Sequence, residues 1–215
     1  MRKQDYGFRS LRRMAAAGYL EKNILPAGSR FVTTGDFESE AKNHCAAVCA
    51  TNLVTYALQK NPNLTKGTPF AEKDGKHTLF MALHHAIGNG PVLFFDTKLR
   101  RFFDNGFGKR YGLRMQSQAV HGFEEIKRAL DADCPCVLLL ANDLFHWHWV
   151  LAVGYRIYEG QDYLETGEMT VMEPGEYLRI ADSWRHQADT FYRIGKGSVL
   201  LLARAYVFQP DGGDR

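Results

Sequence analysis

Long apolar runs are missing from this 215-residue chain. No stretch approaches the ~20 apolar residues of a membrane-spanning helix, and the basic start is not followed by the apolar core of an export signal. We therefore expect a cytoplasmic protein with no membrane partner. The formal net charge is only +3. No nucleic-acid-binding motif accompanies the basic residues, so we also expect no nucleic-acid partner.

Cysteine is scarce, with four in the chain. Cys45 and Cys49 lie one helical turn apart, and Cys134 and Cys136 flank a single proline. Such short spacings are not typical of a disulfide framework, which needs wider cross-links to constrain a chain of this length. We interpret Cys49, Cys134 and Cys136 as small buried apolar side chains. Cys45 is the cysteine left for chemistry.

Helical patterns dominate the first half of the chain and strand patterns the second. The expected helices are residues 8–20, 43–59, 79–87 and 122–131. The expected strands are residues 31–33, 136–141, 147–158, 169–172, 177–182 and 198–208. This segregation favours an α+β fold, with a helical layer packed on an antiparallel sheet. We divide the chain into an N-terminal helical extension (1–30), one main domain (31–209) and a disordered tail (210–215).

The segment that begins at Cys45 has the composition of a buried helix. Asn43 is a favourable N-cap residue, which places Cys45 in the first turn of that helix. Backbone N–H groups at a helix N-terminus lower the pKa of a thiol and can also stabilise an oxyanion. The position of Cys45 therefore suits a nucleophile in acyl chemistry.

A histidine and an aspartate complete the set that such a nucleophile requires. His146 and His148 both precede an apolar strand, and His148 leads directly into it. Asp182 ends a later strand, where an acceptor can fix the tautomer of an imidazole. Trp184 can cover that hydrogen bond and exclude water. The sequence thus predicts Cys45 as nucleophile, His148 as base and Asp182 as the residue that orients it.

These motifs resemble the papain-like cysteine peptidase superfamily, and most closely its bacteriocin-leader-processing, peptidase-C39-like branch. The resemblance spans residues 37–208. It is carried by three motifs: His44-Cys45-Ala46-Ala47, His148-Trp149-Val150 through Gly154-Tyr155, and Asp182-Ser183-Trp184. It implies a papain-like fold with a central nucleophile helix, a peptide or protein substrate, and no cofactor or metal.

Three departures from the family pattern leave alternatives open. Ala46-Ala47 replaces the usual Gly-Pro, and Ser39 stands where the family often has the oxyanion-hole glutamine. Asn43 is the nearest amide donor for that role. These 215 residues hold no transporter domain, so we do not expect the bacteriocin-export role of that branch to apply. A catalytically inactive peptide-binding homologue and a Cys-dependent acyltransferase or transglutaminase-like enzyme stay open. The last alternative is a zinc site, from Cys45, Cys49, His146 and His148 or from Cys134 and Cys136.

Overall fold

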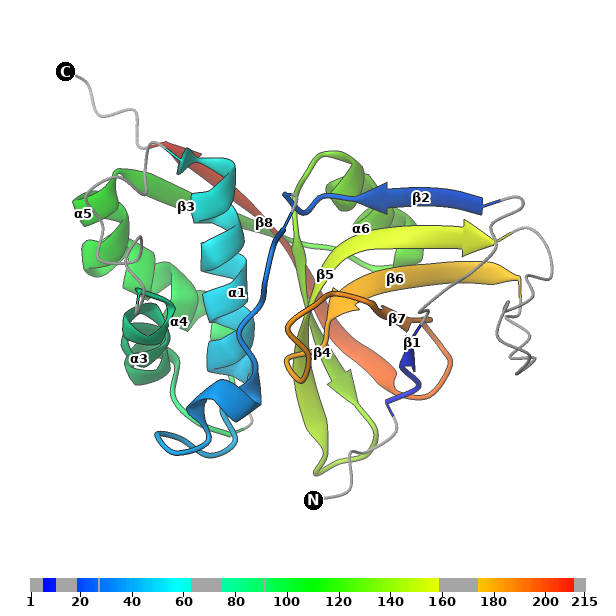
Figure 1. The fold of residues 1–215 in the computed structure, drawn as a ribbon, viewed down its shortest axis with the longest axis horizontal. Coiled ribbons are helices and arrows are strands. Elements are labelled where there is room, and N and C mark those ends of the chain that lie inside the picture. Colours follow the sequence, from blue (N-terminus) through cyan, green and yellow to red (C-terminus); the bar gives the residue numbers. More distant parts are fainter. Residues whose placement is uncertain are drawn as a thin grey trace.

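Helix α1, Cys45–Lys60, stands between the other helices of its layer and the sheet (Figure 1). Its residues are mostly small or apolar, and those from Ala46 to Val54 are all buried. Its two buried polar side chains are paired. Thr51 donates to the Ala47 carbonyl oxygen at 2.8 Å. Asn52 accepts from the backbone N–H of Val32 and donates to its carbonyl oxygen, which ties the preceding loop to the helix.

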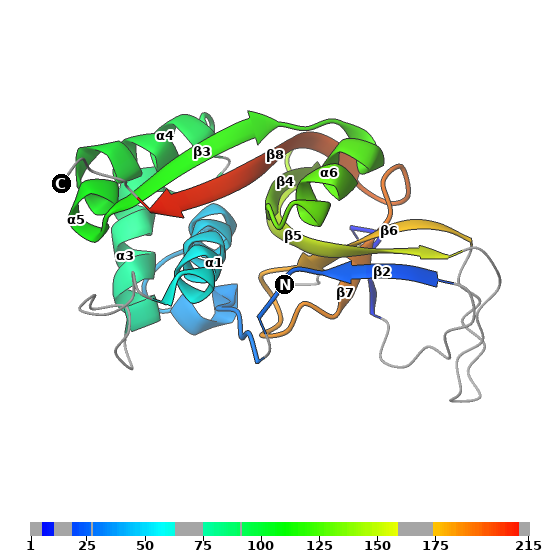
Figure 2. The ribbon, with the colours of Figure 1, turned by 90° about the horizontal axis from the view of Figure 1, so that it is seen from above.

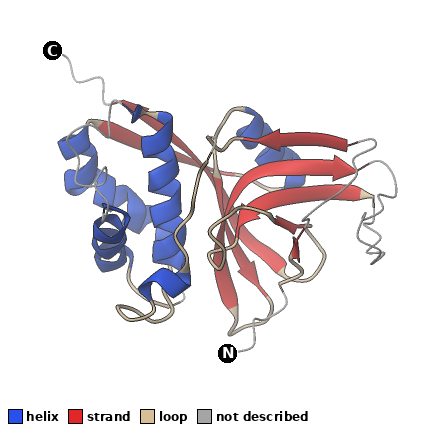
Figure 3. Ribbon diagram, viewed as in Figure 1, coloured by secondary structure: helices blue, strands red, loops and turns tan. Residues whose placement is uncertain are grey.

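The computed structural model has an α+β architecture, with most of its helices gathered to one side of an antiparallel sheet (Figure 3). It describes residues 6–10, 19–26, 28–62, 75–90, 92–158 and 174–210. The α+β class predicted from the sequence is confirmed. The predicted strand 169–172 and the tail beyond Pro210 lie outside the described residues.

The outer helices extend further than the sequence pattern indicated. They are α3 (Gly75–Ile87), α4 (Phe95–Phe102), the short η3 (Phe103–Phe107) and α5 (Gly108–Tyr111). The predicted helix 79–87 begins four residues earlier, at Gly75. Their buried side chains are both aliphatic and aromatic, and Phe102, Phe103 and Phe107 pack on one another.

The sheet runs in the order β1-β7-β6-β5-β4-β8-β3, with β2 also paired to β5. Its strands in the second half are β3 (Leu113–Ala119), β4 (Cys136–Ala141), β5 (Trp147–Tyr158), β6 (Gly175–Ala181), β7 (Thr190–Tyr192) and β8 (Val199–Pro210). The predicted strands 136–141 and 147–158 are confirmed in full. Helix α6, Gly122–Asp131, lies between the β3–β8 pair and the β2–β5 pair, as Figure 2 shows.

The N-terminal region joins the same sheet instead of forming a helical extension. β1 (Arg9–Ser10) pairs with β7, and β2 (Tyr19–Asn23) pairs with β5. The predicted helix 8–20 is therefore wrong at both of its ends, and residues 11–18 lie outside the described residues. Gly154 permits the close β2–β5 approach, because a Cβ there would lie 2.3 Å from the Lys22 carbonyl oxygen.

The segment before α1 is also not the strand predicted at residues 31–33. It is irregular up to the short helix η1, Thr34–Phe37. The backbone N–H of Phe31 donates to the His186 carbonyl oxygen, and that of Thr34 donates to the Ser183 carbonyl oxygen. These bonds tie residues 31–34 to the turn after β6. Among the described residues, no helix combines the length and apolarity needed to cross a bilayer. Cytoplasmic location stays a prediction.

Candidate functional site

Cys45 is the first residue of α1, at the end of the helix that faces the sheet's β4–β5 loop (Figure 1). The residue that precedes the helix is His44, not Asn43, so the predicted N-cap is wrong. Asn43 adopts a left-handed conformation with φ 53°, and its carbonyl oxygen accepts from Gly90. Its exposed side chain lines the same cleft as Cys45. Asn43 is therefore not committed to capping.

His148 lies near the start of β5, and only 4% of it is exposed. Its Nε2 lies 2.7 Å from the backbone carbonyl oxygen of Asp182. A carbonyl oxygen only accepts, so Nε2 carries the proton and Nδ1 keeps a free lone pair. His148 is thus fixed in the tautomer in which Nδ1 is the basic nitrogen.

Asp182 contacts His148 through its backbone and not, as the sequence suggested, through its carboxylate. Oδ1 accepts from the backbone N–H groups of Trp184 (2.9 Å) and Arg185 (3.0 Å). Oδ2 accepts from the Thr190 hydroxyl at 2.9 Å. The buried carboxylate therefore holds the turn that follows β6. The conformation of this turn fixes the position of the Asp182 carbonyl oxygen, which accepts from His148.

Trp184 covers the imidazole as a parallel ring. Its centroid lies 4.2 Å from that of His148, with an interplanar angle of 11°. Stacking of this kind excludes water from one face of the imidazole and fixes its plane. The prediction that Trp184 shields the His148–Asp182 contact agrees with this geometry.

Tyr6 covers the imidazole from a second direction, and sequence reasoning missed it. Its ring centroid lies 5.3 Å from that of His148 and 5.9 Å from that of Trp184. The segment that carries Tyr6 is held by the loop that precedes β8, where the Ser198 hydroxyl donates to the Tyr6 carbonyl oxygen. A Cβ on Gly7 would lie 2.5 Å from the Lys196 carbonyl oxygen. No local pattern signals this contact, because its partners are more than 140 residues away.

Burial determines the protonation states of the Cys45 thiol and the His148 imidazole. It raises the pKa of the Cys45 thiol, although the backbone N–H groups of Trp149, Ala46 and Cys45 itself oppose the rise. It lowers the pKa of His148 to about 4, against a smaller opposing effect of Asp182. The thiol pKa was expected to fall at the helix N-terminus, and this expectation is wrong because desolvation outweighs the N–H groups. The resting pair is a neutral thiol and a neutral imidazole.

A single cleft of about 580 Å³ joins these residues. Its lining includes aromatic side chains, from Tyr6, Phe145, Trp147 and Trp184. It also includes polar side chains, from Thr34, Glu38, Lys42 and Asn43. Cys45 and His148 both line it, and so does His146, which is held by Asp143 at 2.6 Å. The cleft has room for an extended peptide beside the thiol.

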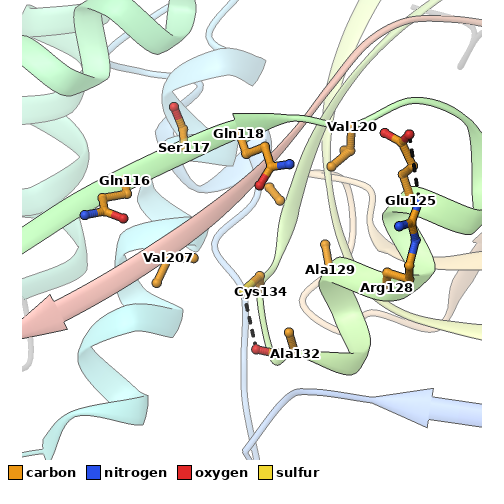
Figure 4. A pocket seen from close by; sticks show the side chains of 11 residues that line it. Gln116, Ser117, Gln118, Val120, Glu125, Arg128, Ala129, Ala132, Cys134 and Val207 are labelled. Carbon is orange, nitrogen blue, oxygen red and sulfur yellow. Dashed lines mark hydrogen bonds and ion pairs between the residues drawn. The ribbon is translucent and has the colours of Figure 1, made fainter.

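A second hollow, between α6 and the β3–β8 pair, carries no comparable set of groups (Figure 4). Gln116, Gln118 and Cys134 line it, and the Cys134 thiol points to the Ala132 carbonyl oxygen. Desolvation raises the pKa of Cys134. In the parts of the chain that the structure describes, no three His, Cys, Asp or Glu side chains gather as a metal site would require.

Comparison with known proteins adds no relative: no protein-family model matches the chain, and no curated protein does.

Substitutions of Asp182 distinguish the role of its carboxylate from that of its backbone carbonyl group. We expect Asp182→Ala to lower the free energy of unfolding by about 2–4 kcal/mol, because it leaves the N–H groups of Trp184 and Arg185 without their acceptor. Asp182→Asn keeps one acceptor oxygen and the backbone carbonyl, so we expect a cost of about 1 kcal/mol. Thr190→Val is the matched control: it removes the hydroxyl that donates to Oδ2 and accepts from Arg185, but it keeps both backbone hydrogen bonds to Oδ1. Urea denaturation measures all three, and equal stability of Asp182→Ala and wild type would contradict the assignment.

Proposed function

We propose that this protein is a papain-like cysteine peptidase or amidase that hydrolyses peptide or amide bonds with Cys45, His148 and Asp182. The observation that carries the proposal is the shared cleft. In it, a thiol at the N-terminus of a buried helix faces the same space as an imidazole whose Nε2–H is fixed on the Asp182 carbonyl oxygen. The sequence resemblance to the peptidase-C39-like branch supports the same reading.

The neutral pair favours general-base catalysis over a preformed thiolate. Nδ1 of His148 takes the proton as the Cys45 sulfur attacks the carbonyl carbon. The imidazolium then gives that proton to the leaving nitrogen, the C–N bond breaks, and a thioester remains. Water, deprotonated by His148, attacks the thioester and releases the acid and the thiol. The backbone N–H groups at the start of α1 and the Asn43 amide are the proposed oxyanion donors.

The same protonation state favours a second candidate, a catalytically inactive homologue that binds peptides. A raised pKa at Cys45 and a lowered one at His148 both oppose the thiolate–imidazolium pair. The cleft would then bind a peptide without cleaving it. An acyltransferase would use the apparatus of the active form, with an amine in place of water.

Covalent labelling tests the proposal. A peptidyl vinyl sulfone needs thiol attack together with proton delivery by the base, so we expect it to modify Cys45 about 10²-fold faster than Cys134. Cys134 is the matched control because it is partly exposed and its thiol pKa is also raised. Intact-mass spectrometry followed by peptide mapping measures both rates. Equal rates at the two cysteines favour the inactive homologue.

The pH dependence of that labelling follows from His148. Its pKa of about 4 means that the base loses its lone pair only as the pH falls through that value. We therefore expect the labelling rate of Cys45 to hold on the acid side until about pH 4 and to decline below it. A decline centred near pH 6.5, the ordinary range of histidine, would show that the base is not the buried His148.

A further inference from the structure

The loop between β4 and β5 exposes two large apolar side chains, and one of them lines the cleft. Leu144 is 82% exposed and Phe145 is 88% exposed. Phe145 lines the cleft together with Cys45 and His148. Figure 1 shows this loop at the same end of the molecule as the start of α1. Contiguous exposed apolar surface is a common feature of ligand-binding grooves.

The loop is held in this conformation by Asp143. Oδ1 accepts from the backbone N–H groups of Phe145 (2.8 Å) and His146 (2.9 Å). Oδ2 lies 2.6 Å from the His146 ring nitrogen Nδ1. The backbone N–H of Asn142 closes the loop on the His146 carbonyl oxygen at 3.0 Å. The two apolar side chains are therefore displayed by a preorganised turn, which lowers the entropy lost when a ligand covers them.

The lining of the cleft contains further aromatic side chains, Trp147, Trp184 and Tyr6. Tyr6 and Trp184 are in contact, with ring centroids 5.9 Å apart. The lining also contains one acidic and one basic side chain, Glu38 and Lys42, whose charges cancel. A peptide in the cleft would therefore find its most specific contacts for a large apolar side chain.

We infer that Leu144 and Phe145 form a specificity-determining lip, which selects peptides with a bulky apolar side chain within one or two residues of the bond that Cys45 attacks. This inference rests on the proposed function for the position of the scissile bond. The lip itself acts through peptide binding. Its effect can therefore be measured as peptide capture, without turnover.

Peptide capture by the Cys45→Ala protein tests the inference. This variant cannot form a thioester, so immobilised protein retains whatever the cleft binds. A pool of randomised hexapeptides is passed over it, and mass spectrometry compares the bound peptides with the input. We expect peptides with Phe, Leu, Tyr or Trp to be enriched about tenfold over those with Asp or Glu, the discrimination typical of an apolar contact.

Three further variants in the Cys45→Ala background locate the effect. Leu144→Ser with Phe145→Ser is expected to reduce the enrichment below about threefold. Asp143→Ala keeps both side chains but frees the turn, and should give an intermediate value. Phe94→Ser is the matched control, since Phe94 is 77% exposed but does not line the cleft. It should leave the enrichment unchanged.

The outcomes separate this inference from the proposed function. No apolar enrichment in Cys45→Ala, or equal loss in the Phe94→Ser control, overturns the lip. Apolar enrichment without any reaction of wild-type Cys45 with a vinyl sulfone built on the captured sequence supports the lip and overturns the peptidase. Reaction of Cys45 without apolar enrichment supports the peptidase and overturns the lip.

Discussion

Replacing Cys45 by alanine should reduce hydrolysis of any peptide that the protein cleaves by about 10⁴-fold or more, because no other group in the cleft can form the thioester. The fold should survive this change. Cys45 is only partly buried at the first position of α1, and alanine is the best helix former. We expect the free energy of unfolding to change by less than about 1 kcal/mol.

Cys49→Ala is the matched control for this prediction. Cys49 lies one turn further along α1 and is fully buried in the main core. Its removal leaves a small cavity, so we expect a stability loss of about 1–2 kcal/mol with activity retained. Peptide hydrolysis and urea denaturation measure the two effects. Activity that survives Cys45→Ala, or that disappears equally in Cys49→Ala, would contradict the role of Cys45 as nucleophile.

The elements with strong local patterns were predictable from the sequence. Residues 122–131 carry a helical periodicity, residues 147–158 are a nearly continuous apolar run, and tertiary packing reinforces both elements. The cap of α1 was not predictable. Asn43 is a good N-cap by propensity, but its carbonyl oxygen bonds Gly90 and its backbone is left-handed. A contact with a residue 47 positions away decided the local conformation.

The N-terminal strands were missed for a related reason. β1 and β2 exist because β7 and β5 offer them an edge. Neither segment has the length or alternation that identifies a strand alone. The contact of Tyr6 with the site was missed for the same reason. The neighbouring Gly7 packs closely against Gly197, which is 190 positions away in the sequence. Long-range pairing of this kind leaves no local signal.

At the site, the sequence identified residues but not the atoms that act. Asp182 was expected to orient His148, and it contacts His148, but the backbone carbonyl makes the contact. Residue type alone cannot distinguish these cases, because every residue has a carbonyl. Likewise, the helix N-terminus suggested a thiol with a lowered pKa, whereas the depth of the site raises it. Burial depends on packing, which composition does not specify.

The burial of His148 couples catalysis to stability, because it lowers the pKa of the imidazole. Its pKa of about 4 in the folded chain lies below the value of 6.5 expected when unfolded. As the pH falls through 6.5, the unfolded chain binds the proton before the folded chain does. The contribution of this group to stability is thus complete above about pH 6.5 and is lost progressively towards pH 4. The expected loss is about 3 kcal/mol.

His148→Gln should abolish this loss and, with it, catalysis. We expect peptide hydrolysis to fall by about 10²–10⁴-fold, the usual contribution of a positioned base. The free energy of unfolding of the variant should vary less between pH 6.5 and 4 than that of wild type, by the same ~3 kcal/mol.

His85→Gln is the matched control, because His85 is exposed and lies on α3, away from the cleft lining. It should keep both the activity and the acid-dependent loss of stability. Urea denaturation at half-unit pH intervals measures this loss in the three proteins. If wild type and His148→Gln lose stability equally between pH 6.5 and 4, then His148 is not buried as a neutral imidazole. The acid limit of activity should then lie near pH 6.5, the ordinary range of histidine, and not near pH 4.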